Sequence, residues 1–335
     1  MQLQGHSGPV YACAAASRGQ HLASAGREGS ILIWDLTLGD VVHTLNGHRP
    51  AAVNACAWNP SGTELASGGD DMWLRIWDPV RGSLVSGTHR KDLGTVQSVA
   101  YHASQPILAT AHSGLAAFRH GASSCDAIQG LGVVVLWCTR TRFVLSAVKA
   151  RTGRPVCMAF HPSRDVLFVD EATEAGGQTS STVYQATLRV GPAVPGIATA
   201  VQAVIEGHTP IANTEPGRGS FATTERTLRL QSLAFSPNGT RCCIVGDRTL
   251  SVVASSSLDR VVAVLRGHEG PIFSCAWSRD GRRAASGGHD KLVMVWDMET
   301  MTLLHRLIGH AWTVFAVTFA TQDVYGSSLI ASAGG

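Results

Sequence analysis

The sequence of 335 residues predicts an all-β fold built from seven similar units along the chain. Three observations support this prediction: two dipeptides recur at a fixed spacing, seven short segments share one apolar pattern, and glycine is abundant. The 36 glycines favour many turns over long helices. With 44% hydrophobic and 15% charged residues, the chain has enough apolar side chains for a packed core and too little charge for a disordered one.

The first observation is a lattice of Gly-His and Trp-Asp dipeptides. His6 and His48 are 42 residues apart, and so are His268 and His310. The distance from the histidine to the following tryptophan is 28, 29 and 28 residues in three copies. The dipeptides begin at Gly5, Gly47, Gly207, Gly267 and Gly309, and at Trp34, Trp77 and Trp296. A fixed period of this length is typical of repeat architectures.

The second observation comes from the segment after each Gly-His position, where large and small side chains alternate with period two. Such alternation is typical of a strand with two unlike faces. One column of equivalent residues is Cys13, Cys56, Val99, Met158, Leu233, Cys275 and Val317. The next column is small, with Ala14, Ala57, Ala100, Ala159, Ala234, Ala276 and Thr318. The third is mostly aromatic, with Ala15, Trp58, Tyr101, Phe160, Phe235, Trp277 and Phe319. Seven copies predict seven units.

This pattern resembles the WD40-repeat family, whose members form seven-bladed β-propellers. The resemblance covers essentially the whole chain and implies one domain, residues 1–335, with four antiparallel strands in each blade. Gly-His would precede the innermost strand, and Trp-Asp would end the third strand. The blades are expected at residues 5–46, 47–87, 88–148, 149–206, 207–266, 267–308 and 309–335, the last together with 1–4.

The resemblance also implies a structural tetrad in each regular blade, made of a histidine, a serine or threonine, an aspartate and a tryptophan. Such a buried polar network must be satisfied internally, and it would fix a turn to the sheet. Three blades match, with Glu28 in place of the aspartate in the first. The expected sets are His6, Ser24, Glu28 and Trp34; His48, Ser67, Asp71 and Trp77; and His268, Ser286, Asp290 and Trp296.

Blades three to five depart from this pattern. Blade three has Thr88-His89 where Gly-His is expected, then Thr110 and Trp137, with an insertion over about residues 112–131. Blades four and five have Val169 and Ile244 at the serine position. Blade five keeps His208 and has a second insertion at residues 209–227. In this family, both insertions would lie on the top face.

The seventh blade is expected to be incomplete. Its second strand is predicted near residues 329–332, and by register the tetrad aspartate would follow Gly335. Residues 1–4 are few for an outer strand, so we expect a poorly closed ring with an exposed strand edge on blade seven. Whether the chain is a fragment of a longer protein stays open.

The motifs predict no enzyme, no cofactor and no metal site. No GxSxG, GxxxxGK[ST] or HExxH motif is present. His112, His120 and Cys125 cluster in the blade-three insertion, but their spacing fits no standard zinc pattern. The acidic residues Asp170, Glu171 and Glu174 are expected at a solvated strand end or loop.

The composition and the first residues of the chain indicate where in the cell the protein is expected. The net charge of +3 lies far below that of a dedicated nucleic-acid binder. The apolar segment from residue 190 to 205 is interrupted by Pro192 and Pro195, so no membrane span is expected. The N-terminus has no secretory pattern, and the eight cysteines fit buried apolar positions better than disulfides. The sequence therefore predicts a cytoplasmic or nuclear protein.

A non-catalytic scaffold for protein complexes is the predicted function. Aromatic side chains are common interface anchors, and four of them are expected near the top mouth of the channel: Tyr11, Phe273, Trp312 and Phe315. The same rings could instead cap the core between blades, and the sequence leaves both interpretations open.

Two alternative functions also remain. An RNA-associated propeller in a ribonucleoprotein would use a basic patch of Arg151, Arg154, Arg226 and Arg229. A substrate receptor of a ubiquitin ligase would carry a Trp-Asp-x-Arg motif. Only blade three has that arginine, Arg140, and Cys138 replaces its aspartate.

Overall fold

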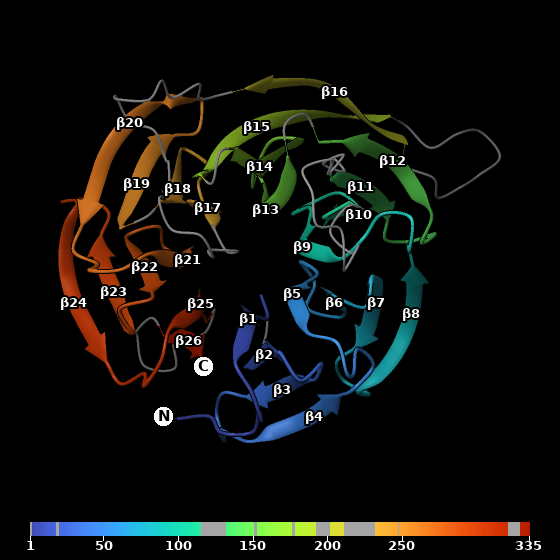
Figure 1. Ribbon diagram of the computed structural model, residues 1–335, viewed down its shortest axis with the longest axis horizontal. Helices are drawn as coiled ribbons and strands as arrows, with labels where there is room; N and C mark the ends of the chain where they lie inside the picture. Colours follow the sequence, from blue (N-terminus) through green and yellow to red (C-terminus); the bar gives the residue numbers. More distant parts are fainter. Residues whose placement is uncertain are drawn as a thin grey trace.

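Seven separate antiparallel sheets stand around a central axis in the computed structural model of the protein (Figure 1). Six of the sheets have four strands, and the seventh has two. The structure describes residues 2–17, 20–114, 132–150, 153–175, 178–191, 202–210, 232–246, 248–320 and 329–335. These residues form strands and turns, as the sequence predicts for an all-β propeller.

The strands follow the chain order within each blade. Blade one contains β1 (Val10–Ala15), β2 (His21–Gly26), β3 (Ile31–Asp35) and β4 (Val41–Leu45). Blade two contains β5 (Val53–Trp58), β6 (Leu65–Gly69), β7 (Trp73–Asp78) and β8 (Ser83–His89). Blade three contains β9 (Val96–Tyr101), β10 (Ile107–His112), β11 (Val133–Cys138) and β12 (Val144–Lys149).

The remaining blades follow the same order. Blade four contains β13 (Arg154–Phe160), β14 (Val166–Ala175), β15 (Gln178–Gly191) and β16 (Gln202–Pro210). Blade five contains β17 (Leu233–Phe235), β18 (Arg241–Val245), β19 (Thr249–Ala254) and β20 (Ser257–Arg266). Blade six contains β21 (Ile272–Trp277), β22 (Arg283–Gly288), β23 (Leu292–Asp297) and β24 (Thr302–Ile308). Blade seven contains β25 (Val314–Phe319) and β26 (Ile330–Gly334).

The first strands of the seven blades form a closed inner ring (Figure 1). Each first strand contacts the first strand of the next blade, and β25 contacts β1. The expectation of a poorly closed ring is therefore wrong at the inner circumference, because β25 and β26 both pack against β1. Among the described residues, blade seven consists of its first two strands, β25 and β26, which agrees with the predicted incomplete blade.

The topology gives the propeller two distinct faces. All first strands run in the same direction, so we call the face where they begin the top face and the opposite one the bottom face. In an antiparallel meander, the turns between first and second strands and between third and fourth strands lie on the bottom face. The turns between second and third strands, and the loops before the first strands, lie on the top face.

One register recurs in all seven blades. The first sequence column pairs with a fixed position on the second strand: Cys13 with Ser24, Cys56 with Ser67, Val99 with Thr110, Met158 with Val169, Leu233 with Ile244, Cys275 with Ser286, and Val317 with Ser332. The hydroxyl-bearing side chains of five blades, and the aliphatic ones of blades four and five, therefore occupy equivalent places.

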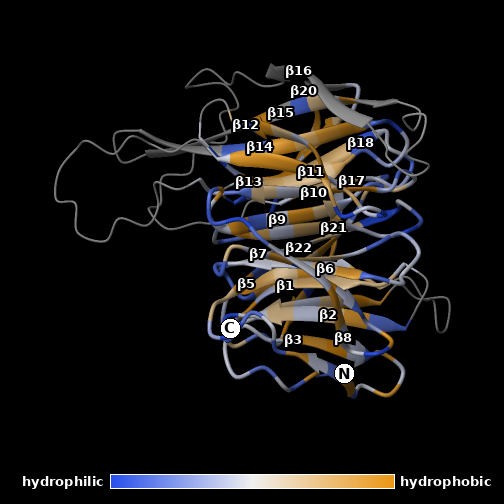
Figure 2. Ribbon diagram, turned by 90° about the vertical axis from the view of Figure 1, so that its right-hand side faces the viewer, coloured by the Kyte–Doolittle hydropathy of each residue, from blue (hydrophilic) through white to orange (hydrophobic). Residues whose placement is uncertain are grey.

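The core lies between neighbouring blades, where the alternating columns fit together. Apolar strand centres and polar turns are visible from the side (Figure 2). A Cβ at Gly68 would collide with Val96 of the next blade, so a small residue is needed there. The large side chains of the third, mostly aromatic column contact the preceding blade. The Trp58 and Trp277 indole N–H groups donate to the carbonyls of Ala14 and Ala234 at 2.8 and 3.0 Å.

Blade four is the most irregular of the described blades. Its strand β15 has 14 residues, of which 178–187 pair with β14 and 184–191 pair with β16. Strand β16 ends at Pro210 and contains Gly207 and His208, which the sequence had assigned to the loop before blade five. The expected boundary after residue 206 therefore falls inside a strand, because His208 and Thr209 pair with Ala186 and Gln185 instead of leading into a new blade.

Candidate functional site

A hydrogen-bonded tetrad is present in blades one, two and six. In blade two, the His48 Nδ1–H donates to Asp71 at 2.9 Å, and the Ser67 hydroxyl donates to His48 Nε2 at 2.7 Å. The Trp77 indole N–H donates to the same hydroxyl oxygen at 2.8 Å. Blade six repeats these contacts with His268, Ser286, Asp290 and Trp296. Blade one repeats them with His6, Ser24, Glu28 and Trp34.

The glycine before each tetrad histidine lies against the tryptophan ring of the same blade. A Cβ at Gly47 would come within 2.6 Å of the Trp77 ring, and one at Gly5 within 3.0 Å of Trp34. Gly309 of blade seven has no atom within 4 Å of that position in the described part of the chain. The Gly-His dipeptide thus reflects close approach of the backbone to a tryptophan ring.

The tetrads are structural, and burial favours the neutral form of two of their histidines, His48 and His268. Burial lowers the pKa of His48, although the hydrogen bond and charge of Asp71 oppose this effect. Burial also lowers the pKa of His268. For Asp71, burial alone would raise the pKa, but hydrogen bonds from His48 and Arg75 outweigh it and leave the pKa lowered. Because each serine hydroxyl is buried and bonded to both a histidine and a tryptophan, it cannot reach a substrate as a nucleophile.

Blade three builds the same unit from a different histidine. The Trp137 indole N–H donates to Thr110 Oγ1 at 2.8 Å, as expected. The Thr110 hydroxyl donates to Nε2 of His112 at 2.9 Å, and His112 Nδ1–H reaches the Gly94 carbonyl at 3.4 Å. His89 instead stacks on Trp73 at the end of β8, with ring centroids 4.8 Å apart. The expectation that Thr88-His89 replaces Gly-His is therefore wrong, because β10 supplies the histidine.

Blades four, five and seven lack complete tetrads in the described residues. Val169 and Ile244 are buried at the serine position, so apolar packing replaces the polar network. In blade seven, the Ser332 hydroxyl donates to His310 Nε2 at 2.8 Å. The complete tetrads thus occur in blades one, two and six, the blades for which the sequence predicts them.

The four aromatic candidates for partner binding lie on the top face, and three of them share one structural feature. The register shifts by one residue at Tyr11, Phe273 and Phe315, so each occupies a β-bulge in its first strand. Asn54, Gln97 and Val156 occupy the equivalent bulges of blades two, three and four. A bulge re-aims the side chain that it carries. The three aromatic residues that predicted a binding site at the channel mouth are therefore the residues at the β-bulges of their first strands.

Three of these rings contact one another across blades six, seven and one. Phe315 lies between Tyr11, at a centroid distance of 5.5 Å with an edge-to-face geometry, and Phe273, at 5.4 Å. We call these three residues the aromatic mouth. Phe273 is buried, whereas Tyr11 and Phe315 are partly exposed. The sequence left open whether these rings bind a partner or cap the core between blades. Phe273 packs in the core, whereas Tyr11 and Phe315 also present surface to solvent.

Trp312 lies on the loop before β25, three residues before Phe315 in the sequence. Its side chain is 66% exposed, and the Lys291 ammonium lies 5.6 Å from the ring centroid. Lys291 belongs to the turn between β22 and β23, which is also on the top face. A large exposed ring beside a cation is a suitable anchor for a protein partner.

The other candidate sites are only partly described. Arg154 lies at the start of β13, whereas Arg151, Arg226 and Arg229 lie outside the described residues. His120 and Cys125 also lie outside them, and His112 is buried in β10. Among the residues with described positions, no group of three or more histidines, cysteines or acidic residues could hold a metal ion.

The acidic residues of blade four are not solvated as the sequence suggested. Asp170 and Glu171 are buried within β14, with 4% and 2% exposure, because this strand continues past the point where the regular blades turn. The side chain of Glu174 is not described. The cysteines agree with apolar packing: the seven described ones are free thiols, and burial raises the pKa of Cys56 to about 12.

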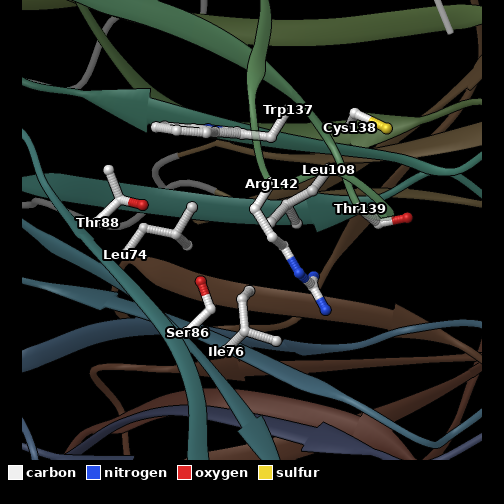
Figure 3. Close-up of a pocket in the computed structure, with 9 residues that line it drawn as sticks. All are labelled: Leu74, Ile76, Ser86, Thr88, Leu108, Trp137, Cys138, Thr139 and Arg142. Carbon is white, nitrogen blue, oxygen red and sulfur yellow. The ribbon is translucent and has the colours of Figure 1, made fainter. Parts of the chain in front are cut away.

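Sequence reasoning did not find the ion pair between Arg142 and Glu64, which links blades three and two. Arg142 has a positive φ of 64°, at the turn position occupied by Gly39 and Gly82 in blades one and two. Its guanidinium group points across the junction toward Ile76 and Ser86 (Figure 3). The absence of glycine at this turn was the available signal.

The fold and the tetrads together define a class of protein, the β-propellers made of WD40 repeats. The sequence model of one family, described as WD domain, G-beta repeat, matches residues 1–35, 39–78 and 259–297. These segments include most of blades one, two and six, the three blades with complete tetrads. These three segments of the chain are therefore WD40 repeats. Within the described residues, no helix has the length and apolarity needed to cross a bilayer.

Curated relatives share short segments with the chain. Protein FIZZY-RELATED 3 of Arabidopsis thaliana is 36% identical over 22% of this chain and 15% of its own length. The human U5 small nuclear ribonucleoprotein 40 kDa protein is 33% identical over 19% of each. Human WD repeat and SOCS box-containing protein 1 is 30% identical over 29% of this chain and 24% of its own. The chain thus matches less than a quarter of the length of each relative named here.

Proposed function

We propose that the protein is a non-catalytic scaffold that holds a partner protein against its top face. A WD40 propeller generally serves as an interaction scaffold, with its specificity in surface residues rather than in the fold. The aromatic mouth carries the proposal: Tyr11 and Phe315 present ring surface at bulged positions of adjacent blades, held in place by contact with each other.

The exposed Trp312 presents a further aromatic ring on the loop before β25. An aromatic anchor buries a large area at a small cost in side-chain entropy, which is why such residues dominate binding energy at interfaces. The rigid inner ring keeps the three rings in place before the partner arrives, which lowers the cost of binding. Free thiols in all seven described cysteines support a reducing, intracellular setting for the complex.

Affinity capture from cell extract, quantified by mass spectrometry, tests this proposal. We expect Trp312→Ala and Tyr11→Ala to lower retention of specific partners by about tenfold or more, as truncation of an interface anchor does. Leu84→Ala is the matched control, because Leu84 is 51% exposed on the outer strand β8, far from the mouth. Equal retention by all variants, with unchanged thermal unfolding, would refute the proposal.

RNA association is the second candidate function, and one comparison favours it: a relative is named as a component of a ribonucleoprotein. Arg154 at the start of β13 would belong to the basic patch that this function requires. The same capture experiment separates the two candidates. RNA binding would weaken steeply with salt and fall with Arg154→Ala, whereas binding through the aromatic mouth would change little with salt.

A further inference from the structure

Blade seven has an open strand edge where the other blades continue. Its outer described strand, β26, pairs with β25 alone, whereas the second strand of every other blade also pairs with a third strand (Figure 1). All five residues of β26 are partly exposed, but the equivalent strands β2, β6 and β22 are buried along almost their whole length. An open edge presents unpaired backbone N–H and C=O groups, which can pair with an added strand.

The polar groups beside this edge form half of a tetrad. The Ser332 hydroxyl donates to His310 Nε2 at 2.8 Å, as the serines of blades two and six donate to their histidines. Within the described residues, no tryptophan N–H reaches Ser332 and no carboxylate accepts a hydrogen bond from His310 Nδ1. In the complete blades, both of these groups come from the third strand and the turn before it, with the carboxylate six residues before the tryptophan.

A space next to this half tetrad has the position of a tryptophan ring. A Cβ at Gly47 or Gly267 would meet the tryptophan ring of its own blade at 2.6 or 3.2 Å. A Cβ at Gly309 would meet no atom within 4 Å in the described structure. The same dipeptide that approaches a ring in the complete blades therefore faces open space in blade seven.

One leucine beside this space is exposed, although its counterparts are buried. Leu307 stands three residues before the histidine of blade seven and is 44% exposed. Leu45 and Leu265 hold the same position before the histidines of blades two and six, and they are 2% and 4% exposed. They are covered because they pack in core clusters with Trp77 and Trp296 of the next blade. A tryptophan on a third strand of blade seven would cover Leu307 in the same way.

Within these 335 residues, no segment is free to supply this tryptophan. An aspartate or glutamate six residues before a tryptophan occurs three times in the sequence, at residues 28–34, 71–77 and 290–296. Each of these segments already completes the tetrad of its own blade. A second copy of the chain could provide one only by unfolding a blade, which favours another protein as the occupant.

We infer that the open edge of β26 binds an extended segment of a partner protein as the third strand of blade seven. This segment carries an aspartate or glutamate six residues before a tryptophan. The tryptophan ring covers Gly309 and Leu307, and its N–H group donates to Ser332. The carboxylate accepts the Nδ1–H of His310. Backbone hydrogen bonds to β26 provide affinity, and the two side chains provide specificity. The site is separate from the aromatic mouth, so the inference does not rest on the proposed function.

Fluorescence anisotropy with a labelled peptide tests this inference on the full chain. The probe copies residues 289–298 of blade six, with the sequence HDKLVMVWDM, which contain a third strand and the carboxylate before it. Replacing the tryptophan of the peptide by alanine should weaken binding by about tenfold or more. Replacing its first aspartate by asparagine should weaken binding several-fold, because a charge-assisted hydrogen bond is lost. Ser332→Ala in the protein should weaken binding of the unaltered peptide several-fold.

Gly309→Ala separates docking from folding. The space at this position is open, so the variant should unfold at the same temperature as the unaltered protein. The added Cβ would collide with the ring of the docked tryptophan, so the affinity for the peptide should fall by about tenfold. Gly8→Ala, on the loop before β1, is the matched control. A Cβ there meets only ordinary contacts, at 3.6 Å or more, and peptide binding should not change.

The pKa of His310 provides a second readout. Burial lowers this pKa in the chain alone, and a carboxylate raises the pKa of a histidine, as the charge of Asp290 does for His268 against the effect of burial. An NMR titration should therefore give a higher pKa for His310 with the aspartate peptide than with the asparagine peptide.

Three results would overturn the inference. The first is equal affinity for the tryptophan and alanine peptides, and the second is unchanged affinity in the Gly309→Ala variant. The third is a dimer of the chain that excludes the peptide, which would assign the edge to a second copy. Tyr11→Ala should leave peptide binding unaltered, so a failure of the aromatic mouth can be told apart from a failure of this site.

Discussion

Blades two and three bury the same tryptophan–hydroxyl pair but take their histidine from different places. In blade two, His48 comes from the loop before the first strand and is held by Asp71. In blade three, His112 comes from the second strand, two residues after Thr110, and its other nitrogen has only the Gly94 carbonyl at 3.4 Å. The strand register fixes the position of the hydroxyl group beside the tryptophan. A histidine from either place that reaches this hydroxyl completes the hydrogen-bonded unit.

The difference between the two histidines predicts an unequal response to acid. Burial lowers the pKa of His112 from 6.5 to about 4, although the Gly94 hydrogen bond and the charge of Asp92 oppose this effect. No carboxylate accepts a hydrogen bond from His112, as Asp71 does from His48. Between these pH values the unfolded state binds more protons than the folded state, so stability is full above pH 6.5 and is lost as the pH falls. A shift of this size corresponds to about 3 kcal/mol.

Urea unfolding at pH 7 and pH 4.5 measures this effect. His112→Gln should flatten the dependence of the unfolding free energy on pH more than His48→Gln does. The same pH dependence in the His112→Gln variant and in the unaltered protein would show that the acid sensitivity resides elsewhere.

Removing each histidine sharpens the comparison. His48→Ala removes one hydrogen-bond partner from Ser67 and one from Asp71, so we expect a loss of about 2–3 kcal/mol in unfolding free energy. His112→Ala removes one partner of Thr110 and should cost about 1–2 kcal/mol. His89→Ala breaks a ring stack with Trp73 and should cost about 0.5–1 kcal/mol. Thermal or urea unfolding measures all three, and a larger loss for His89 than for His112 would contradict the assignment of His112.

The smallest expected effect concerns blade one, where Glu28 stands in place of the aspartate. The second carboxylate oxygen of Glu28 is buried without a hydrogen-bond partner in the described structure. Glu28→Asp would restore the residue of blades two and six, and we expect a change within about 1 kcal/mol. Urea unfolding of this variant beside Asp71→Glu measures it. A loss above that size for Glu28→Asp would mean that the longer side chain is required.

The regular blades could be predicted closely because local register decides them. The pairs Cys13–Ser24 and Cys56–Ser67 follow from one sequence column, and the tryptophan N–H then has a single hydroxyl within reach. His112 could not be predicted in this way. Its role depends on a side chain that turns back along its own strand, and Thr88-His89 offered a dipeptide nearer to the expected pattern.

The burial of two acidic residues in blade four could not be predicted from the sequence either. Asp170 and Glu171 resemble a solvated strand end, yet the long β14 and β15 carry them into the interior. The aromatic mouth was predicted as a column, whereas the bulges that display it arise from backbone pairing.

Site-specific photo-crosslinking tests the central claim, that partners dock on the aromatic top surface, most directly. A benzophenone amino acid would replace Trp312 in one variant and Leu84 in another, both exposed in the structure. After irradiation in cells, we predict specific crosslinked proteins for position 312 and not for position 84. Crosslinks of equal yield at both positions, or none at position 312, would contradict the claim.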